Sequence, residues 1–156
     1  MTESKFLMDD VRGFRHAEDL IRQVVDELRP RFHVKPGLRN SMPELDEDEE
    51  LNEADENRDV QRMTNVEVTY SLEPGTTEPA PDNASVFGQV ETLWQRRGYD
   101  TLIRVVDPPP RRLCVRDPRD GFTISINEGQ AGNLWLTAAS GPVVYTQATP
   151  PPPGIF

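Results

Sequence analysis

The spacing of apolar residues near the start of the chain predicts an amphipathic helix over residues 10–29. Apolar positions recur there at intervals of three and four, which places them on one side of a helix. Asp9 or Asp10 suits the N-cap, and Pro30 ends the helix. The predicted apolar stripe consists of Phe14, Ala17, Leu20, Ile21, Val24, Val25 and Leu28.

A second helix is predicted over residues 83–97, starting from an N-cap at Asp82 or Asn83. Gly98 follows at the position where a left-handed residue commonly ends a helix, and Tyr99 is placed to fold back on the last turn. The apolar stripe of this helix is Val86, Phe87, Val90, Leu93 and Trp94.

Alternation of apolar and polar residues over 66–72 predicts a half-buried strand. Further strands are predicted over 101–106, 113–116, 122–126 and 134–138, with a short addition at 143–145. The turn Pro118–Gly121 joins two of them. We therefore expect an α+β protein in the order α-β-α-β-β-β-β, with an antiparallel sheet of about five strands and two helices packed on one face.

One acidic segment carries most of the formal charge of −10. Residues 43–59 hold ten acidic residues and one Arg, so the rest of the chain is close to neutral. The few apolar residues of this segment are not expected to offset its ordering entropy. We predict a single α+β domain over residues 1–146, interrupted at about 38–63 by a disordered acidic loop, and a Pro-rich flexible tail over 147–156.

Composition bears on source and location. Of the 17 basic residues 15 are Arg, a bias typical of GC-rich genomes, which suggests an actinobacterial source. Residues 1–10 lack the pattern of a signal peptide, and no stretch approaches the ~20 apolar residues of a membrane span. The sequence as it stands predicts a soluble, cytoplasmic protein without a transmembrane segment, or a cell-envelope protein if a leader has been removed.

Potential metal ligands do not form a motif. The run Asp-x-Asp-x-Glu at 46–50 opens like a calcium loop, but Leu51 and Asn57 stand where such a loop needs Gly and Glu. Neither His16 nor His33 has a second ligand at a suitable spacing, and both are expected to be structural. We predict no metal site and no cofactor.

Two potential nucleophiles lack the surroundings of a catalytic site. Ser140 has no glycine two residues before it, as a nucleophile elbow requires. Cys114 is the single cysteine, so no disulfide forms within the chain. It lies within a predicted strand and is expected to be a buried, slowly reacting thiol, although Arg112 and Arg116 share its side of that strand. We expect no catalytic residue and a protein that is not an enzyme.

A cluster of arginines is the remaining candidate site. Residues 96–119 contain seven Arg and three Asp, a net charge of +4 over 24 residues. Arg guanidinium groups suit carboxylates and phosphates. Arg104 and Arg116 alternate with apolar residues in their strands, so they could face solvent together. The cluster is an ordinary solvated face, a dock for the acidic segment, or a site for an acidic partner. The predicted partner-binding residues are Arg104, Arg111, Arg112 and Arg116.

Three stretches carry a family resemblance. Residues 91–99 (ETLWQRRGY), 120–126 (DGFTISI) and 132–140 (GNLWLTAAS) together resemble small actinobacterial envelope lipoproteins of unassigned function. In that family a helix ending in Trp-x-x-x-Gly-Tyr precedes a strand meander. The resemblance implies this fold and a link to the cell envelope, and it implies no catalytic residues. This chain has no lipid-attachment cysteine near residue 1, and Gly141-Pro-Val replaces a cysteine-containing region.

These observations favour a non-catalytic protein-interaction module, which is a partner-neutralising (immunity-like) or accessory protein. Its partner is expected to be a protein, and no nucleic-acid partner is expected. The alternative is a small-molecule or lipid-binding envelope protein that holds its ligand between the helices and the sheet.

Overall fold

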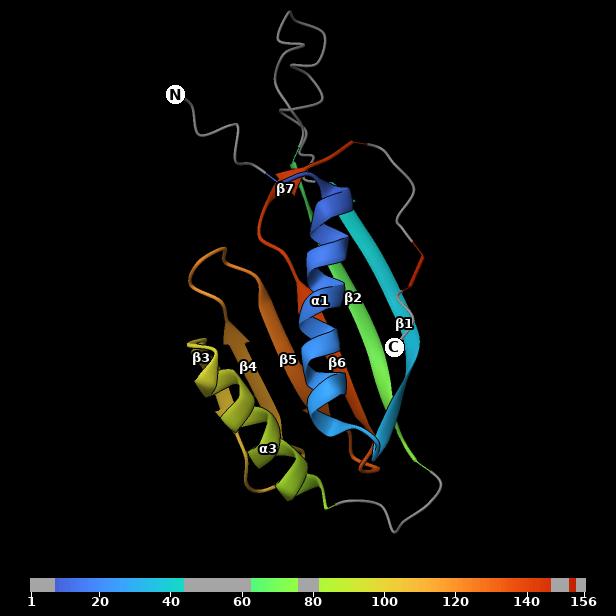
Figure 1. Ribbon diagram of the computed structural model, residues 1–156, viewed down its shortest axis with the longest axis vertical. Helices are drawn as coiled ribbons and strands as arrows, with labels where there is room; N and C mark the ends of the chain where they lie inside the picture. The colour runs from blue at the N-terminus through green and yellow to red at the C-terminus, as the bar shows by residue number, and fades with distance from the viewer. Residues whose placement is uncertain (1–7, 44–62, 76–81, 147–151, 154–156) are drawn as a thin grey trace, which may run out of the picture.

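The computed structural model describes residues 8–43, 63–75, 82–146 and 152–153. Two helices lie against one antiparallel sheet (Figure 1), which confirms the predicted α+β class and the order of helices and strands around it. The sheet has seven strands instead of about five. Neither helix is long and apolar enough to cross a membrane in the described part of the chain.

The two helices begin and end as their sequences predict. Helix α1 spans Asp10–Leu28, and the side chain of Asp9 accepts a hydrogen bond from the backbone N–H of Arg12 at 2.9 Å. Helix α3 spans Asn83–Arg96, with Asp82 capping it in the same way. Gly98 has a φ of +79°, so the left-handed turn predicted after α3 is confirmed.

One continuous hydrogen-bonded sheet contains all seven strands. The strands are β1 (Phe32–Pro43), β2 (Met63–Pro74), β3 (Asp100–Val105), β4 (Arg112–Arg116), β5 (Thr123–Glu128), β6 (Leu134–Ala139) and β7 (Val143–Val144). Strands β3 to β6 form a meander, β6 pairs with β2, and β2 pairs with β1, so the order is β1-β2-β6-β5-β4-β3. Strand β7 pairs with the start of β2.

Strand β1 corrects the predicted extent of the acidic loop. Residues 38–43 belong to this strand, which pairs with β2 from Phe32 to Pro43. Its sequence contains two prolines and a glycine, and its ladder is irregular between Pro36 and Arg39. An edge strand tolerates these residues, whereas they hide the alternation that identifies a strand. The remainder of the predicted loop (44–62) and most of the predicted tail lie outside the described residues.

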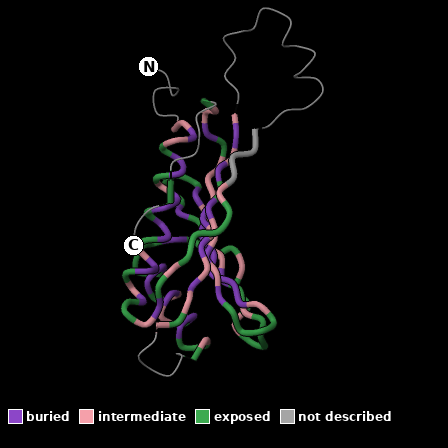
Figure 2. Tube along the Cα trace, turned by 90° about the vertical axis from the view of Figure 1, so that its right-hand side faces the viewer, coloured by how far each residue is buried: buried purple, intermediate pink, exposed green. Residues whose placement is uncertain are grey.

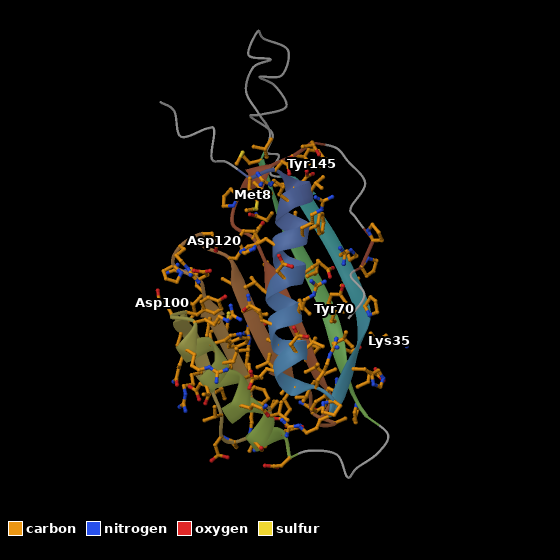
Figure 3. The ribbon with its side chains drawn as sticks, viewed as in Figure 1. Met8, Lys35, Tyr70, Asp100, Asp120 and Tyr145 are labelled. Carbon is orange, nitrogen blue, oxygen red and sulfur yellow. The ribbon has the colours of Figure 1, made fainter. Side chains whose placement is uncertain are left out.

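The core fills the space between the helices and one face of the sheet. In Figure 2 the helix layer lies beside the sheet, with buried residues between the two. The largest fully buried side chains include Trp94, Tyr70, Phe14 and Phe87. Tyr70 of β2 lies beside α1 (Figure 3), and its hydroxyl donates a hydrogen bond to Glu18 Oε1 at 2.5 Å. No described helix lies on the opposite face of the sheet.

Candidate functional site: the uncovered face of the sheet

Alternate residues of the central strands point away from the helices. In β2 the even-numbered positions 64–72 are buried and the odd-numbered positions are more accessible, and the same alternation holds in β4 and β6. The residues that share the uncovered face are Glu67, Thr69 and Ser71 on β2, Trp135, Thr137 and Ala139 on β6, Thr123, Ser125 and Asn127 on β5, and Arg112, Cys114 and Arg116 on β4.

Strand register arranges these side chains in rows that cross the sheet. The middle row consists of the small residues Thr69, Thr137, Ser125 and Cys114. The row on one side is Glu67, Ala139, Thr123 and Arg116, and the row on the other is Ser71, Trp135, Asn127 and Arg112. Larger charged and aromatic groups therefore stand beside a strip of short hydroxyl and thiol side chains.

A hollow of about 480 Å³ lies on this face. Ser125 and Asn127 lie at its base and are only 6% and 8% exposed although no described helix covers them. Asn127 Nδ2 donates to Ser125 Oγ at 3.0 Å. Trp135 and Arg112 stand on the strands at either side of Asn127, which separates their Cα atoms by about 10 Å. The lining is completed by Glu67, Pro110, Arg111, Glu128 and Thr137.

Glu128 fixes the connection that closes one end of the hollow. Its carboxylate accepts hydrogen bonds from the backbone N–H of Arg111 at 2.8 Å, from the Arg111 guanidinium at 3.1 Å and from Asn83 Nδ2 at 2.7 Å. Burial by itself raises the pKa of Glu128, but the hydrogen bonds from Asn83 and Arg111 outweigh it and lower that pKa below its ordinary value. The hollow is therefore bounded by a fixed loop.

The structure separates the four predicted partner-binding arginines. Arg104 is in register with Leu113, so it lies on the helix side, where its guanidinium donates to Glu91 at 2.6 and 3.3 Å. Arg111 is committed to Glu128 and to the carbonyl of Val106 at 2.9 Å. Arg104 and Arg116 are both exposed, but they lie on opposite faces of the sheet, because the irregular ladder between Thr101 and Ile103 places Arg104 on the helix side.

Arg112 and Arg116 remain on the uncovered face, and both are exposed. None of the ion pairs seen among the described residues includes either of them. Asp100 is the register neighbour of Arg116 on β3, whereas the neighbours of Arg112 are Asn127 and Val105. Two cations thus lie four residues apart on one strand face.

Cys114 lies between these two arginines and is half-buried. The expectation of a buried thiol is therefore wrong, because Leu113 and Val115 occupy the core side of β4 instead. Burial nevertheless raises the pKa of the Cys114 thiol, and the nearby charge of Arg112 lowers it by less. The thiol is protonated at neutral pH, which favours contact over nucleophilic attack.

Ser140 and His16 make structural contacts. Ser140 Oγ accepts from the backbone N–H of Val66 at 2.9 Å and donates to the carbonyl of Gly141 at 2.6 Å. His16 Nε2 lies 2.7 Å from Asp120 Oδ2, and His33 is exposed on β1. Within the described ranges no three His, Cys, Asp or Glu side chains gather to hold a metal ion. The calcium-like run at 46–50 lies outside those ranges.

Sequence reasoning missed Trp135, Ser125 and Asn127, which line the hollow. The alternation in the fourth and fifth predicted strands held the necessary signal. Both helices lie on one face of the sheet, so every second residue of each strand must lie on the other face. A Trp and two polar residues at those positions indicate that this face differs from an ordinary solvent-facing sheet.

No protein-family model matches the chain, and neither the curated proteins nor the solved structures contain a significant match. The resemblance to envelope lipoproteins, the bacterial source and the location therefore stay predictions. The fold defines a two-layer α+β protein with one sheet face that no described helix covers.

Proposed function

We propose that the chain is a non-catalytic interaction module that binds a protein partner through the uncovered face of its sheet. The observation that carries this proposal is the hollow between Trp135 and Arg112, on a sheet face that also presents Arg116. Neither Arg112 nor Arg116 has an ion pair among the described residues. Tryptophan and arginine are enriched at the centres of protein interfaces. A partner-neutralising role is one form that such a module takes.

The packing of the other face favours this surface over a ligand held between helices and sheet. Phe14, Phe87 and Trp94 of the helices are at most 2% exposed, and so are Tyr70 and Ile124 of the sheet. A lipid placed between the layers would have to displace these side chains, at a cost of several kcal/mol for large core residues. The ligand-binding alternative stays a prediction.

Site-specific photo-crosslinking in the cells that encode the chain tests the proposal. A photoreactive phenylalanine analogue replaces Thr137 on the uncovered face, and in a matched strain it replaces Asp19 on the exposed side of α1. We expect a discrete protein adduct from position 137 and none from position 19. Adducts of equal yield from both positions, or from position 19 alone, would contradict the proposal.

A further inference from the structure

We infer that the segment recognised by the uncovered face carries two acidic side chains, one for Arg112 and one for Arg116, and an apolar side chain that packs against Trp135 in the hollow. This inference rests on the proposed function and names the chemistry of the partner. It draws on the spacing of the arginines, the charges around them and the shape of the hollow.

The spacing of the two arginines suits an extended segment. Arg112 and Arg116 are the first and last residues of β4 and point to the same side, so their Cα atoms are about 13 Å apart. Acidic residues four positions apart in an extended chain have the same spacing and also share a side. Each guanidinium presents a planar fork of donors that matches one carboxylate. A single terminal carboxylate would satisfy only one of the pair.

The surrounding charges favour separate carboxylates over a continuous run of phosphates. Glu67 and Asp100 lie in the same row as Arg116, at its two ends. A nucleic-acid backbone running along this row would meet both carboxylates, which repel it. An extended acidic segment that follows β4 meets only the two arginines and the Cys114 thiol between them. A protein segment is therefore the better fit.

The two arginines are not equivalent. Asp100 stands beside Arg116 in register, whereas the register neighbours of Arg112 are Asn127 and the exposed Val105. The nearby carboxylate of Glu128 is already engaged by Arg111 and Asn83. Arg112 therefore offers the less compensated charge, and we expect it to contribute more to binding than Arg116.

The hollow determines which side chain of the partner can lie beside its two acidic groups. Trp135 and Arg112 stand on strands about 10 Å apart with β5 between them, and the hollow above β5 admits one side chain or one extended backbone. The indole offers an apolar surface, since Trp135 is only partly buried. At the base, the Ser125 hydroxyl accepts from Asn127 and keeps its own proton to donate, and the Asn127 amide oxygen can accept from a peptide N–H.

Selection from a phage library of random dodecapeptides tests the inference. The wild-type protein is the bait, and the double variant R112E/R116E serves for counter-selection. R12E/R15E, which reverses two exposed arginines of α1, is the matched control bait. We expect enriched peptides with two acidic residues four apart and an aromatic or aliphatic residue near them, recovered equally well by wild type and control.

A synthetic peptide of the enriched consensus then gives magnitudes by fluorescence anisotropy. We expect R112E to weaken binding at least tenfold and R116E less, since reversal both removes an attraction and adds a repulsion. Trp94 is buried, so a binding-induced change in tryptophan emission should vanish in W135F. Near-ultraviolet circular dichroism confirms that each variant is folded. The variant R112Q removes the charge of Arg112 without reversing it, and its binding is measured in the same way.

Three results would overturn the inference. They are enrichment of peptides without acidic residues, equal recovery by wild type and R112E/R116E, and tighter binding of a single-stranded 20-nucleotide DNA than of the best peptide. The crosslinking experiment separates the two proposals. An adduct at position 137 combined with any of these results would leave the interaction surface in place and reject its acidic partner.

Discussion

The imidazole Nε2 of His16 lies 2.7 Å from Oδ2 of Asp120, although 104 residues separate the two in sequence. His16 belongs to α1 and Asp120 to the turn between β4 and β5, which lies beside that helix in Figure 3. The same ring meets the edge of Phe122 with centroids 4.4 Å apart. These contacts attach the turn at Pro118–Gly121 to helix α1.

Replacing His16 with Ala should lower the free energy of unfolding by about 1–2 kcal/mol, because it removes a hydrogen bond and an edge-to-face aromatic contact. His33→Ala is the matched control, since His33 is exposed on an edge strand, and it should change stability by less than about 0.5 kcal/mol. Urea denaturation followed by circular dichroism measures both. Equal effects of the two substitutions would show that the His16 contact contributes nothing.

Two buried carboxylates predict how stability depends on pH. Burial opposes ionisation of Glu128 and Asp117, yet hydrogen bonds from Asn83 and Arg111 to the first, and from Arg119 to the second, lower the pKa of each. The unfolded chain then binds more protons than the folded one in acid. Stability is fully present above the ordinary pKa values of 4.5 and 3.8 and should be lost as the pH falls toward the lower folded-state values.

Glu128→Gln isolates the contribution of one of these two carboxylates. The substitution keeps the shape of the side chain but removes the charge that pairs with Arg111, and it should cost about 2 kcal/mol at pH 7. The loss should shrink toward pH 3, where the wild-type carboxylate is itself being protonated. Asp19→Asn on the exposed side of α1 is the control. A loss that stays constant between pH 7 and pH 3 would mean that the charge of Glu128 is not responsible.

Cys114 should react with a small disulfide reagent several-fold more slowly in the native protein than in urea at pH 8. Burial raises the pKa of its thiol, so the reactive thiolate is scarcer in the folded state at any given pH. The reaction should nevertheless go to completion without unfolding, because the side chain is only half-buried on the uncovered face. A rate equal to the unfolding rate would instead place the thiol in the core.

The positions of the helices were predictable because their signals are local. The apolar stripe of α1, the caps Asp9 and Asp82, and the left-handed Gly98 all act within one or two helical turns. Strand β1 was not predictable in this way. It is stabilised by pairing with β2, which begins 20 residues after β1 ends, and the proline and glycine residues of its sequence oppose a strand assignment when they are considered alone.

The site was predictable only in part for a related reason. Alternation placed Arg112 and Arg116 on one side of β4, and the structure places them there. Arg104 departed from this pattern because the ladder irregularity between Thr101 and Ile103 changes which side later residues face. The engagement of Arg111 by Glu128 depends on contacts between separate strands and a helix terminus, and no single-strand pattern records them.

Two glycines of the α3 region should respond to the same substitution with opposite signs. Gly88 lies on the exposed side of α3, and a Cβ there would meet nothing within 4 Å. Gly88→Ala should therefore stabilise the protein by about 0.5–1 kcal/mol, because Ala loses less backbone entropy in a helix.

Gly98 is equally open, but its φ of +79° is unfavourable for any residue with a Cβ, so Gly98→Ala should destabilise by about 1 kcal/mol. Guanidinium denaturation of both variants, with unchanged slopes, gives the two values. Stabilisation by both would mean that the turn after α3 relaxes out of the left-handed region, and the contact of Tyr99 N–H with the carbonyl of Trp94 at 3.2 Å would be lost with it.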